Sequence, residues 1–165
     1  MCGIIGITAS LSFLKEPIGT IIEKCLRRLE YRGYDSVGFA YIDVEKSGII
    51  VRKAKGKIDE VASKLGFDTA KSTTSIGHTR WATHGKPCDY NAHPHIDCHG
   101  RIAVVHNGII QNYLQLREDL ISRGHVFRSE TDTEVIPHIL EEYVSRGRSP
   151  IEAIREAFKV LKGAF

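Results

Sequence analysis

The first half of the chain alternates between short apolar runs and amphipathic segments. Residues 2–9, "CGIIGITA", form an isoleucine-rich run typical of a buried strand. In residues 17–33 apolar side chains recur at helical spacing, which predicts a helix that begins at a proline and ends at a glycine. Residues 36–43 and 48–56 predict the two strands of a hairpin, and residues 57–66 predict a short helix.

The second half of the chain predicts fewer strands and more helix. Residues 73–85 begin as a strand and end as a loop, and the proline- and glycine-containing stretch 85–100 indicates a longer loop. Residues 101–110 predict a strand that runs into a glycine turn. Helical periodicity returns in three segments: 112–124, 129–147 and 149–163. Gly124 and Gly163 are expected to end the first and the last of these helices.

Two of these helices carry N-terminal capping signals. Thr131 and Glu134 have the spacing of a capping box, and Asp132 falls in the first turn, where the helix dipole favours a negative charge. Ser149 and Glu152 repeat the same spacing at the next helix. The sequence therefore predicts a helix start at each of the two positions.

The order of elements predicts an α+β layered fold. The strands are joined mostly by hairpins and loops rather than by regular crossover helices, which favours antiparallel sheets. The last residues, "KGAF", follow a helix and resemble the start of a further strand. From this we expect a domain that is incomplete at its C-terminus.

Composition and charge are those of an ordinary globular domain. The chain has 165 residues, with 23 basic and 20 acidic side chains, for a net charge of +3. That excess is too small to indicate nucleic acid as a partner. The chain has no run of about 18 apolar residues that could span a membrane, and the N-terminus lacks the basic segment of a signal peptide. We expect a cytoplasmic protein whose four cysteines are free thiols.

Cys2 is the position with the most unusual chemistry. If Met1 is removed, one residue carries a thiol and a free α-amine side by side. A free cysteine thiol, with a pKa of about 8.5, is mostly protonated at neutral pH and needs a base. An α-amine, with a pKa of about 8, can be that base. The simpler interpretation is a small buried residue that happens to lie near the start of the chain.

Three other segments carry groups that an acyl-transfer site for an amino acid needs. The Asn107 amide and the Gly108 backbone N–H could stabilise an oxyanion. The Arg80 guanidinium could bind an α-carboxylate, and Asp132 could accept an ammonium group. Each has a simpler interpretation, because Asn-Gly is a common turn, an arginine often forms a surface ion pair, and an aspartate often caps a helix.

Six motifs occur together and in a familiar order. They are "CGIIGI", "LRRLEYRGYDS", "GHTRWATHG", "NAHPH", "VVHNGIIQN" and "SETDTE". In these motifs the chain resembles the class II glutamine amidotransferases, which are N-terminal-nucleophile (Ntn) hydrolases. The resemblance covers essentially the whole chain. It implies a four-layer αββα sandwich, with antiparallel sheets between helices, of which this chain would hold all but the last strands.

The resemblance also implies roles for particular residues. Cys2 would be the nucleophile with its own α-amine as base, and Asn107 and Gly108 would form the oxyanion hole. Arg80 would bind the α-carboxylate of glutamine and Asp132 its α-amine.

Further residues would complete the substrate site by the same resemblance. Thr83 and His84 would line the glutamine pocket, and Trp81 would belong to the loop that covers it and helps to gate ammonia transfer. Arg32 and Gly33 would close the pocket near the nucleophile.

The implied activity is hydrolysis of glutamine to glutamate and ammonia through a thioester, with neither a cofactor nor a metal. "YRGYDS", "HTRWATHG" and "NAHPH" most resemble the members that aminate fructose 6-phosphate to glucosamine 6-phosphate in hexosamine biosynthesis. In those members a C-terminal sugar isomerase domain uses the ammonia. Residues 1–165 would then be a glutaminase domain without the isomerase domain. A sheet short of strands exposes an edge, so we expect lower stability than in the full domain, or a homodimer formed through that edge.

Three alternatives remain open at this stage. The stretch "CDYNAHPHIDCH" places Cys88, His93, His95, Cys98 and His99 close together, which could instead form a zinc-binding module. The chain could be the glutaminase domain of another class II amidotransferase. It could also be a glutamine sensor without catalysis, although a sensor would not need Cys2.

Overall fold

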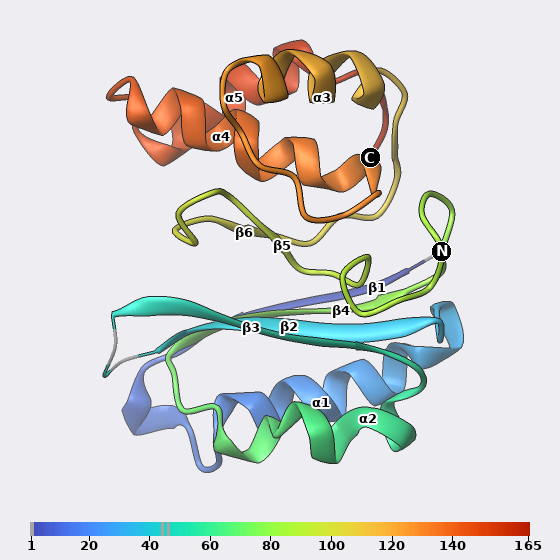
Figure 1. Cartoon of the computed structure of the whole chain (residues 1–165). Coiled ribbons are helices and arrows are strands. Elements are labelled where there is room, and N and C mark those ends of the chain that lie inside the picture. The colour runs from blue at the N-terminus through green and yellow to red at the C-terminus, as the bar shows by residue number, and fades with distance from the viewer. Residues whose placement is uncertain (1, 44, 46) are drawn as a thin grey trace.

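The computed structural model describes residues 2–43, 45 and 47–165. The elements stack in layers, with helices at the two outer faces and strands between them (Figure 1). The α+β architecture with antiparallel pairing is therefore confirmed. No helix within the described residues is long and apolar enough to cross a membrane.

The first strand layer is a four-stranded antiparallel sheet in the order β1-β4-β2-β3. Its strands are β1 (Gly3–Thr8), β2 (Ser36–Asp43), β3 (Gly48–Lys55) and β4 (Thr74–Arg80). The strand β4 lies between β1 and β2, with Gly3 opposite Thr79 and Ser36 opposite Arg80. The start of β1 and the end of β4 thus meet at one end of the sheet.

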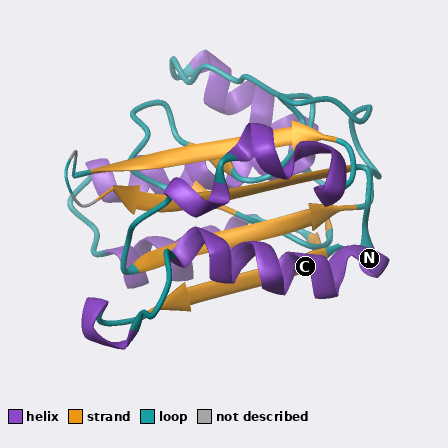
Figure 2. Ribbon diagram, turned by 90° about the horizontal axis from the view of Figure 1, so that it is seen from below, coloured by secondary structure: helices purple, strands orange, loops and turns teal. Residues whose placement is uncertain are grey.

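Two helices, α1 (Ile18–Leu29) and α2 (Ile58–Leu65), cover one face of this sheet, as Figure 2 shows from the helix side. Their apolar stripes pack on the sheet around Ile22, Leu26 and Phe39, which are fully buried. The Phe39 ring stacks on Phe67 with centroids 4.4 Å apart. Burial of a side chain of this size contributes about 1.5–3 kcal/mol, so this core fixes the sheet on which the site is built.

The other half of the chain forms short strands and a second helical layer. The strand pairs are β5 (His95–Ile96) with β6 (Ala103–Val104), and β7 (Ile109–Ile110) with β8 (Gly163–Ala164). The helices are α3 (Tyr113–Ser122), α4 (Val135–Ser145) and α5 (Pro150–Val160). A second core around Ile110, Leu120, Val135, Ala157 and Leu161 joins the helices to β7.

Four short 3-10 turns complete the structure: η1 (Leu11–Phe13), η2 (Glu30–Arg32), η3 (Phe67–Thr69) and η4 (Asp132–Glu134). The turn η4 leads directly into α4, so the segment predicted as one helix over 129–147 begins as a tighter turn. The predicted capping box of Thr131 and Glu134 is wrong. The Glu134 carboxylate instead accepts the backbone N–H groups of Arg128 and Ser129, both at 2.7 Å. The box of Ser149 and Glu152 is confirmed.

At the short strands the sequence prediction fails in most places, although the strand expected to begin in "KGAF" is confirmed by β8. Residues 85–100, predicted as loop, contain β5, and the strand predicted over 101–110 is divided between β6 and β7. Gly163 does not end a helix but opens β8, because α5 stops at Val160. A Cβ at Gly163 would lie 2.0 Å from the Ile109 carbonyl oxygen, so only glycine permits this pairing. Two-residue strands carry too little periodicity for the sequence to reveal them.

Candidate active site

A cavity of about 180 Å³ lies where the start of β1, the end of β4, the loop before β7 and the turn η4 meet. It is smaller than the roughly 300–1,000 Å³ pockets that hold drug-sized ligands, so it suits a ligand of amino-acid size. Its wall is formed by Cys2, Arg80, Trp81, Thr83, His93, His106, Asn107, Gly108, Ile109, Thr131, Asp132 and Thr133. Seven of these residues were predicted as site residues: Cys2, Arg80, Trp81, Thr83, Asn107, Gly108 and Asp132.

Cys2 is held against the loop after β4 and against Asn107. Its Sγ lies 3.3 Å from the backbone N–H of Trp81, which donates to the sulfur. The Cys2 nitrogen donates to Asn107 Oδ1 at 3.4 Å, and Asn107 Nδ2 donates to the Cys2 carbonyl at 3.3 Å. The nucleophile, its α-nitrogen and a side-chain amide are therefore within one small volume.

Arg80 supplies a buried positive charge to the same cavity. Its Nη2 donates to the backbone carbonyls of His84 and of Gly85, the latter at 3.0 Å. Its Nη1 is buried and has no hydrogen-bond partner among the described residues. Burial lowers the pKa of Arg80, against the opposing effect of the nearby Cys2, Asp35 and Asp132. A guanidinium with an unpartnered Nη1 at the cavity wall is suited to a carboxylate ligand.

Asp132, in η4, and Gly108, in the loop before β7, line the same cavity. The Asp132 side chain is buried, and its Oδ2 accepts the backbone N–H of Ile110 at 2.8 Å, which fixes η4 beside β7. Gly108 has φ +154°, and a Cβ there would lie 2.3 Å from the carbonyl oxygen of Ala164. Glycine therefore lets β8 approach the loop that carries Asn107.

Three predicted substrate residues lie behind the cavity wall rather than in it. His84 gives its backbone carbonyl to Arg80, and its ring packs edge-on against Tyr113. The Arg32 Nε donates to the carbonyl of Cys2 at 3.4 Å. At Gly33, a Cβ would lie 2.6–2.8 Å from the backbone of residues 80–81. These three residues therefore contact Cys2, Arg80 and Trp81, which line the cavity, and do not line it themselves.

The sequence reasoning missed two kinds of contributor. Asp35 anchors the loop after β4, because its carboxylate accepts the Ala82 N–H at 2.6 Å and its own N–H donates to the Arg80 carbonyl at 3.0 Å. Thr131 and Thr133 line the cavity on either side of Asp132. Both threonines lie inside the "SETDTE" motif, so the motif itself was the signal that could have identified them.

Two buried histidines, His93 and His106, line the cavity, and a third, His78, packs behind them. His78 stacks on His93 with centroids 4.1 Å apart, and its Nε2 bonds the His106 carbonyl at 3.1 Å. Burial lowers the pKa of His78 to about 3 and that of His93 well below its usual range. Burial also lowers the pKa of His106. These imidazoles are therefore neutral at physiological pH and act as packed hydrogen-bonding groups.

The five residues proposed as an alternative zinc module do not form one cluster in the described structure. Cys88 donates to the Lys86 carbonyl, His95 bonds the Thr131 hydroxyl at 3.0 Å, and His93 lines the cavity beside Arg80. Cys98 and His99 each belong to a group that could hold a metal, Cys98 with His125, His138 and Glu141, and His99 with Asp97 and Glu141. The grouping of these residues in the sequence is therefore not a grouping in space.

The chain matches known proteins along its whole length. It is 53% identical over 165 residues to the glutamine--fructose-6-phosphate aminotransferase (isomerizing) of Sulfurisphaera tokodaii, covering 100% of this chain and 27% of that relative. The protein of the same name from Bradyrhizobium diazoefficiens is 48% identical over 165 residues, of which the chain covers 26%. The chain therefore spans about a quarter of the length of these relatives.

Two solved structures and a family model also resemble this chain. The structure of glutamine phosphoribosylpyrophosphate amidotransferase from B. subtilis, complexed with ADP and GMP, superposes with a TM-score of 0.78 at 28% identity, covering 98% of this chain and 33% of that chain. A structure described as the allosteric regulatory enzyme of purine biosynthesis gives a TM-score of 0.79. The model of the glutamine amidotransferase domain matches residues 78–165. More than half of the chain is thus matched, and the chain belongs to the glutamine amidotransferase family with its Ntn hydrolase fold.

Proposed function

We propose that residues 1–165 belong to a glutaminase domain that hydrolyses glutamine to glutamate and ammonia. The observation that carries this proposal is the cavity in which the Cys2 sulfur, the unpartnered Nη1 of Arg80 and the Asp132 carboxylate are brought together. A free amino acid needs a cation for its carboxylate and an anion for its ammonium group. The cavity offers both beside a nucleophile, in a space that excludes large ligands.

The reaction begins with activation of the thiol. Removal of Met1 frees the α-amine of Cys2, which takes the thiol proton. The Trp81 N–H stabilises the resulting thiolate. The thiolate attacks the side-chain amide carbon of a glutamine that Arg80 and Asp132 hold by its α-carboxylate and α-amine. Asn107 and Gly108 then stabilise the tetrahedral oxyanion.

Collapse of this intermediate gives a thioester. The protonated α-amine passes its proton to the leaving nitrogen, so ammonia departs and the C–N bond is replaced by a C–S bond. Water, deprotonated by the same amine, attacks the thioester and releases glutamate and the free thiol. Trp81, half-exposed and packed edge-on against Tyr34, covers the site during these steps, while Thr83 lines the pocket.

For the whole protein we propose the reaction named for its relatives. A C-terminal domain outside this chain would use the ammonia to aminate fructose 6-phosphate, since identity to proteins of that name is 48–54% over the full chain. The solved phosphoribosylpyrophosphate amidotransferase, at 28%, is a more distant match, which favours the sugar-aminating branch over other class II amidotransferases. The four free thiols support a cytoplasmic location, and a homodimer through a free sheet edge remains part of the proposal.

The test is carried out on the full-length protein. Ammonia and glutamate release are measured with glutamine alone, and the intact mass is recorded before and after treatment with a glutamine analogue that alkylates the active-site thiol. We expect a mass without Met1, one label per chain, and a loss of at least about 1,000-fold in kcat/KM for Cys2→Ala.

Cys88→Ala is the matched control, because Cys88 is also half-buried but outside the cavity wall. It should keep both the label and the activity. Full activity in protein that retains Met1, or in Cys2→Ala, would contradict the proposal.

A further inference from the structure

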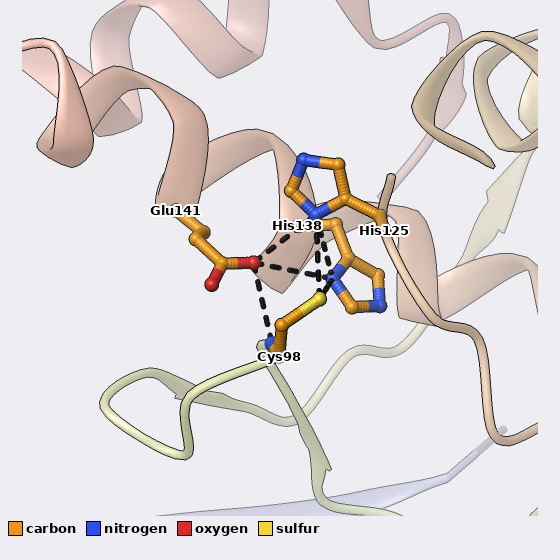
Figure 3. Close-up of side chains that lie close together, drawn as sticks. All are labelled: Cys98, His125, His138 and Glu141. Carbon is orange, nitrogen blue, oxygen red and sulfur yellow. Dashed lines mark hydrogen bonds and ion pairs between the residues drawn. The ribbon is translucent and has the colours of Figure 1, made fainter. Parts of the chain in front are cut away.

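Four side chains of metal-binding type converge at a point away from the glutamine cavity (Figure 3). Cys98 lies in the turn between β5 and β6, and His125 follows α3. His138 and Glu141 stand three residues apart on α4, so they share one face of that helix. The four ligand atoms, which are Cys98 Sγ, the two Nδ1 nitrogens and Glu141 Oε2, all lie within 4.8 Å of one another.

Five of the six separations between these atoms are close to the edges of a zinc tetrahedron, and the sixth, from Cys98 Sγ to Glu141 Oε2, is within 4.8 Å. The two Nδ1 atoms of His125 and His138 are 3.3 Å apart. The sulfur of Cys98 is 3.6 Å from the first and 3.5 Å from the second. Glu141 Oε2 is 3.1 Å from the first and 3.5 Å from the second. Zinc bonds of about 2.0–2.1 Å to nitrogen or oxygen and about 2.3 Å to sulfur give tetrahedral edges of about 3.3 Å for N–N and N–O, and about 3.6 Å for N–S.

Hydrogen bonds among the four side chains explain this arrangement less well than a shared metal ion does. The two Nδ1 atoms face each other at a distance longer than the 2.7–3.2 Å or so of most N–H hydrogen bonds. Both of them also face the same sulfur and the same carboxylate oxygen. Four atoms that share one centre are the arrangement expected of ligands, since a hydrogen-bond network would spread its donors toward separate acceptors.

The surroundings have the outer shell that metal-binding histidines use. The far ring nitrogen of His125 lies 3.3 Å from Glu142 Oε1, and that of His138 faces Glu134 Oε1 at 3.8 Å. The second oxygen of Glu141 pairs with His99 Nδ1. The hydrogen bond to Glu142 fixes the tautomer of His125, so that its Nδ1 is left to bind the metal. The far nitrogen of His138 is buried and has no hydrogen-bond partner among the described residues. The side chains of His138 and Glu141 are only 1% and 4% exposed, so the centre is nearly closed.

We propose that Cys98, His125, His138 and Glu141 bind one Zn²⁺ ion as a structural site. A thiolate with two imidazoles selects zinc over magnesium or calcium, and four protein ligands leave no open position for substrate. The ion would tie the β5–β6 turn to α3 and α4. The β5–β6 pair leads to the loop of Asn107, and η4, which precedes α4, carries Asp132. The zinc would therefore hold the two segments that bring these residues to the cavity. This inference is independent of the proposed glutaminase activity.

The test measures metal directly on the full-length protein. After dialysis with a chelator and addition of Zn²⁺ alone, elemental analysis should give one zinc per chain, and zinc should raise the thermal midpoint. Replacement by Co²⁺ should give the visible bands of a tetrahedral centre together with a thiolate-to-cobalt charge-transfer band, because one ligand is a sulfur.

Ligand variants separate this site from incidental binding. Cys98→Ser and His125→Ala should weaken zinc binding by more than the roughly 100-fold that loss of an outer-shell partner costs, and Cys98→Ser should lose the charge-transfer band. Cys88→Ser, ten residues earlier in the chain, should bind like the parent. The proposal is overturned if the parent binds no zinc, or if Cys88→Ser loses as much affinity as Cys98→Ser. Each readout is a metal measurement, so the result stands whether or not glutamine is hydrolysed.

Discussion

Arg80 is the residue on which the proposed recognition of an amino acid depends most directly. Two backbone carbonyls bind its Nη2, which fixes the plane of the guanidinium and leaves Nη1 toward the ligand. A lysine would keep the charge but could not bond the loop carbonyls and a carboxylate with the same fixed fork. The loss should therefore appear in substrate binding more than in the chemical step.

We expect Arg80→Lys to raise the KM for glutamine by about 10–100-fold with a smaller change in kcat, because the interaction is present in both ground and transition states. Steady-state kinetics of glutamate release in the full-length protein measure both parameters. Arg101→Lys, on an exposed arginine, is the matched control and should leave KM unchanged. A fall in kcat at constant KM would contradict the assignment of Arg80 to substrate binding.

At this scale the motifs could indicate which residues matter but not how they meet. Cys2, Arg80, Asn107 and Asp132 belong to four separate motifs, and only the fold brings them to one cavity. Asp35 lies inside the motif "LRRLEYRGYDS", but its role as the anchor of the loop after β4 could not be deduced, because that role depends on two backbone contacts across the sheet. Sequence spacing cannot reveal contacts of that kind.

Three carbonyls of the loop before β5 bind one side chain of the sheet. Lys53, on β3, donates from Nζ to the carbonyls of Tyr90, Ala92 and Pro94 at 3.2, 2.6 and 3.0 Å. Burial lowers the pKa of Lys53 to about 8, so the amine is still mainly charged at pH 7. The loop carries His93 to the cavity wall, which links this edge of the sheet to the site.

We predict that Lys53→Met lowers the free energy of unfolding by about 3 kcal/mol, because it leaves two partly buried carbonyls and one exposed carbonyl without their donor. Urea denaturation measures the change. Lys71→Met, at an exposed position, should change stability by no more than about 0.5 kcal/mol. Equal effects of the two substitutions would show that the lysine contacts do not hold the loop.

The sequence predicted the long helices and strands more reliably than the short ones. The strands β2 and β3, with eight residues each, and the helix α1 emerged from periodicity because many side chains share one buried face. The strand β5 and the division of residues 101–110 into β6 and β7 did not, since such short pairings depend on partners like Ile110 and Gly163, which are far apart in sequence. Of β8, the sequence indicated only that a strand begins in "KGAF". The turn η4 was predicted as helix because Glu134 has the spacing of a cap, although its carboxylate binds the preceding loop instead.

Across the whole molecule, the cavity lies at the junction of the two halves, and buried imidazoles fill the space beneath it. His78 comes from the first sheet, whereas His93 and His106 come from the short strand segments. His78 contacts both of them, by stacking on His93 and by a bond to the carbonyl of His106. Folding thus requires these imidazoles to be neutral, while in the unfolded chain each can take up a proton.

This difference predicts that acid destabilises the protein before its carboxylates titrate. The folded-state pKa of His78 is about 3 and that of His93 is well below normal, whereas an unfolded histidine has a pKa of about 6.5. Between those values the unfolded chain binds more protons, so stability is complete above about pH 6.5 and falls with decreasing pH by up to about 1.4 kcal/mol per pH unit for each histidine. Urea denaturation at several pH values from about 7.5 to about 5 measures this slope.

His78→Gln tests whether the slope arises from these histidines. A glutamine can still donate to the His106 carbonyl but cannot take up a proton, so its slope should be smaller by about one histidine's contribution, roughly 1.4 kcal/mol per pH unit at most. Ser75→Ala removes a buried hydrogen bond to the Ala40 carbonyl and should lower stability equally at every pH. Any metal bound at Cys98 is common to all three proteins and cancels in the comparison. If His78→Gln keeps the full slope, the protons that unfold the molecule bind elsewhere, and the two halves of the fold are not joined through neutral imidazoles.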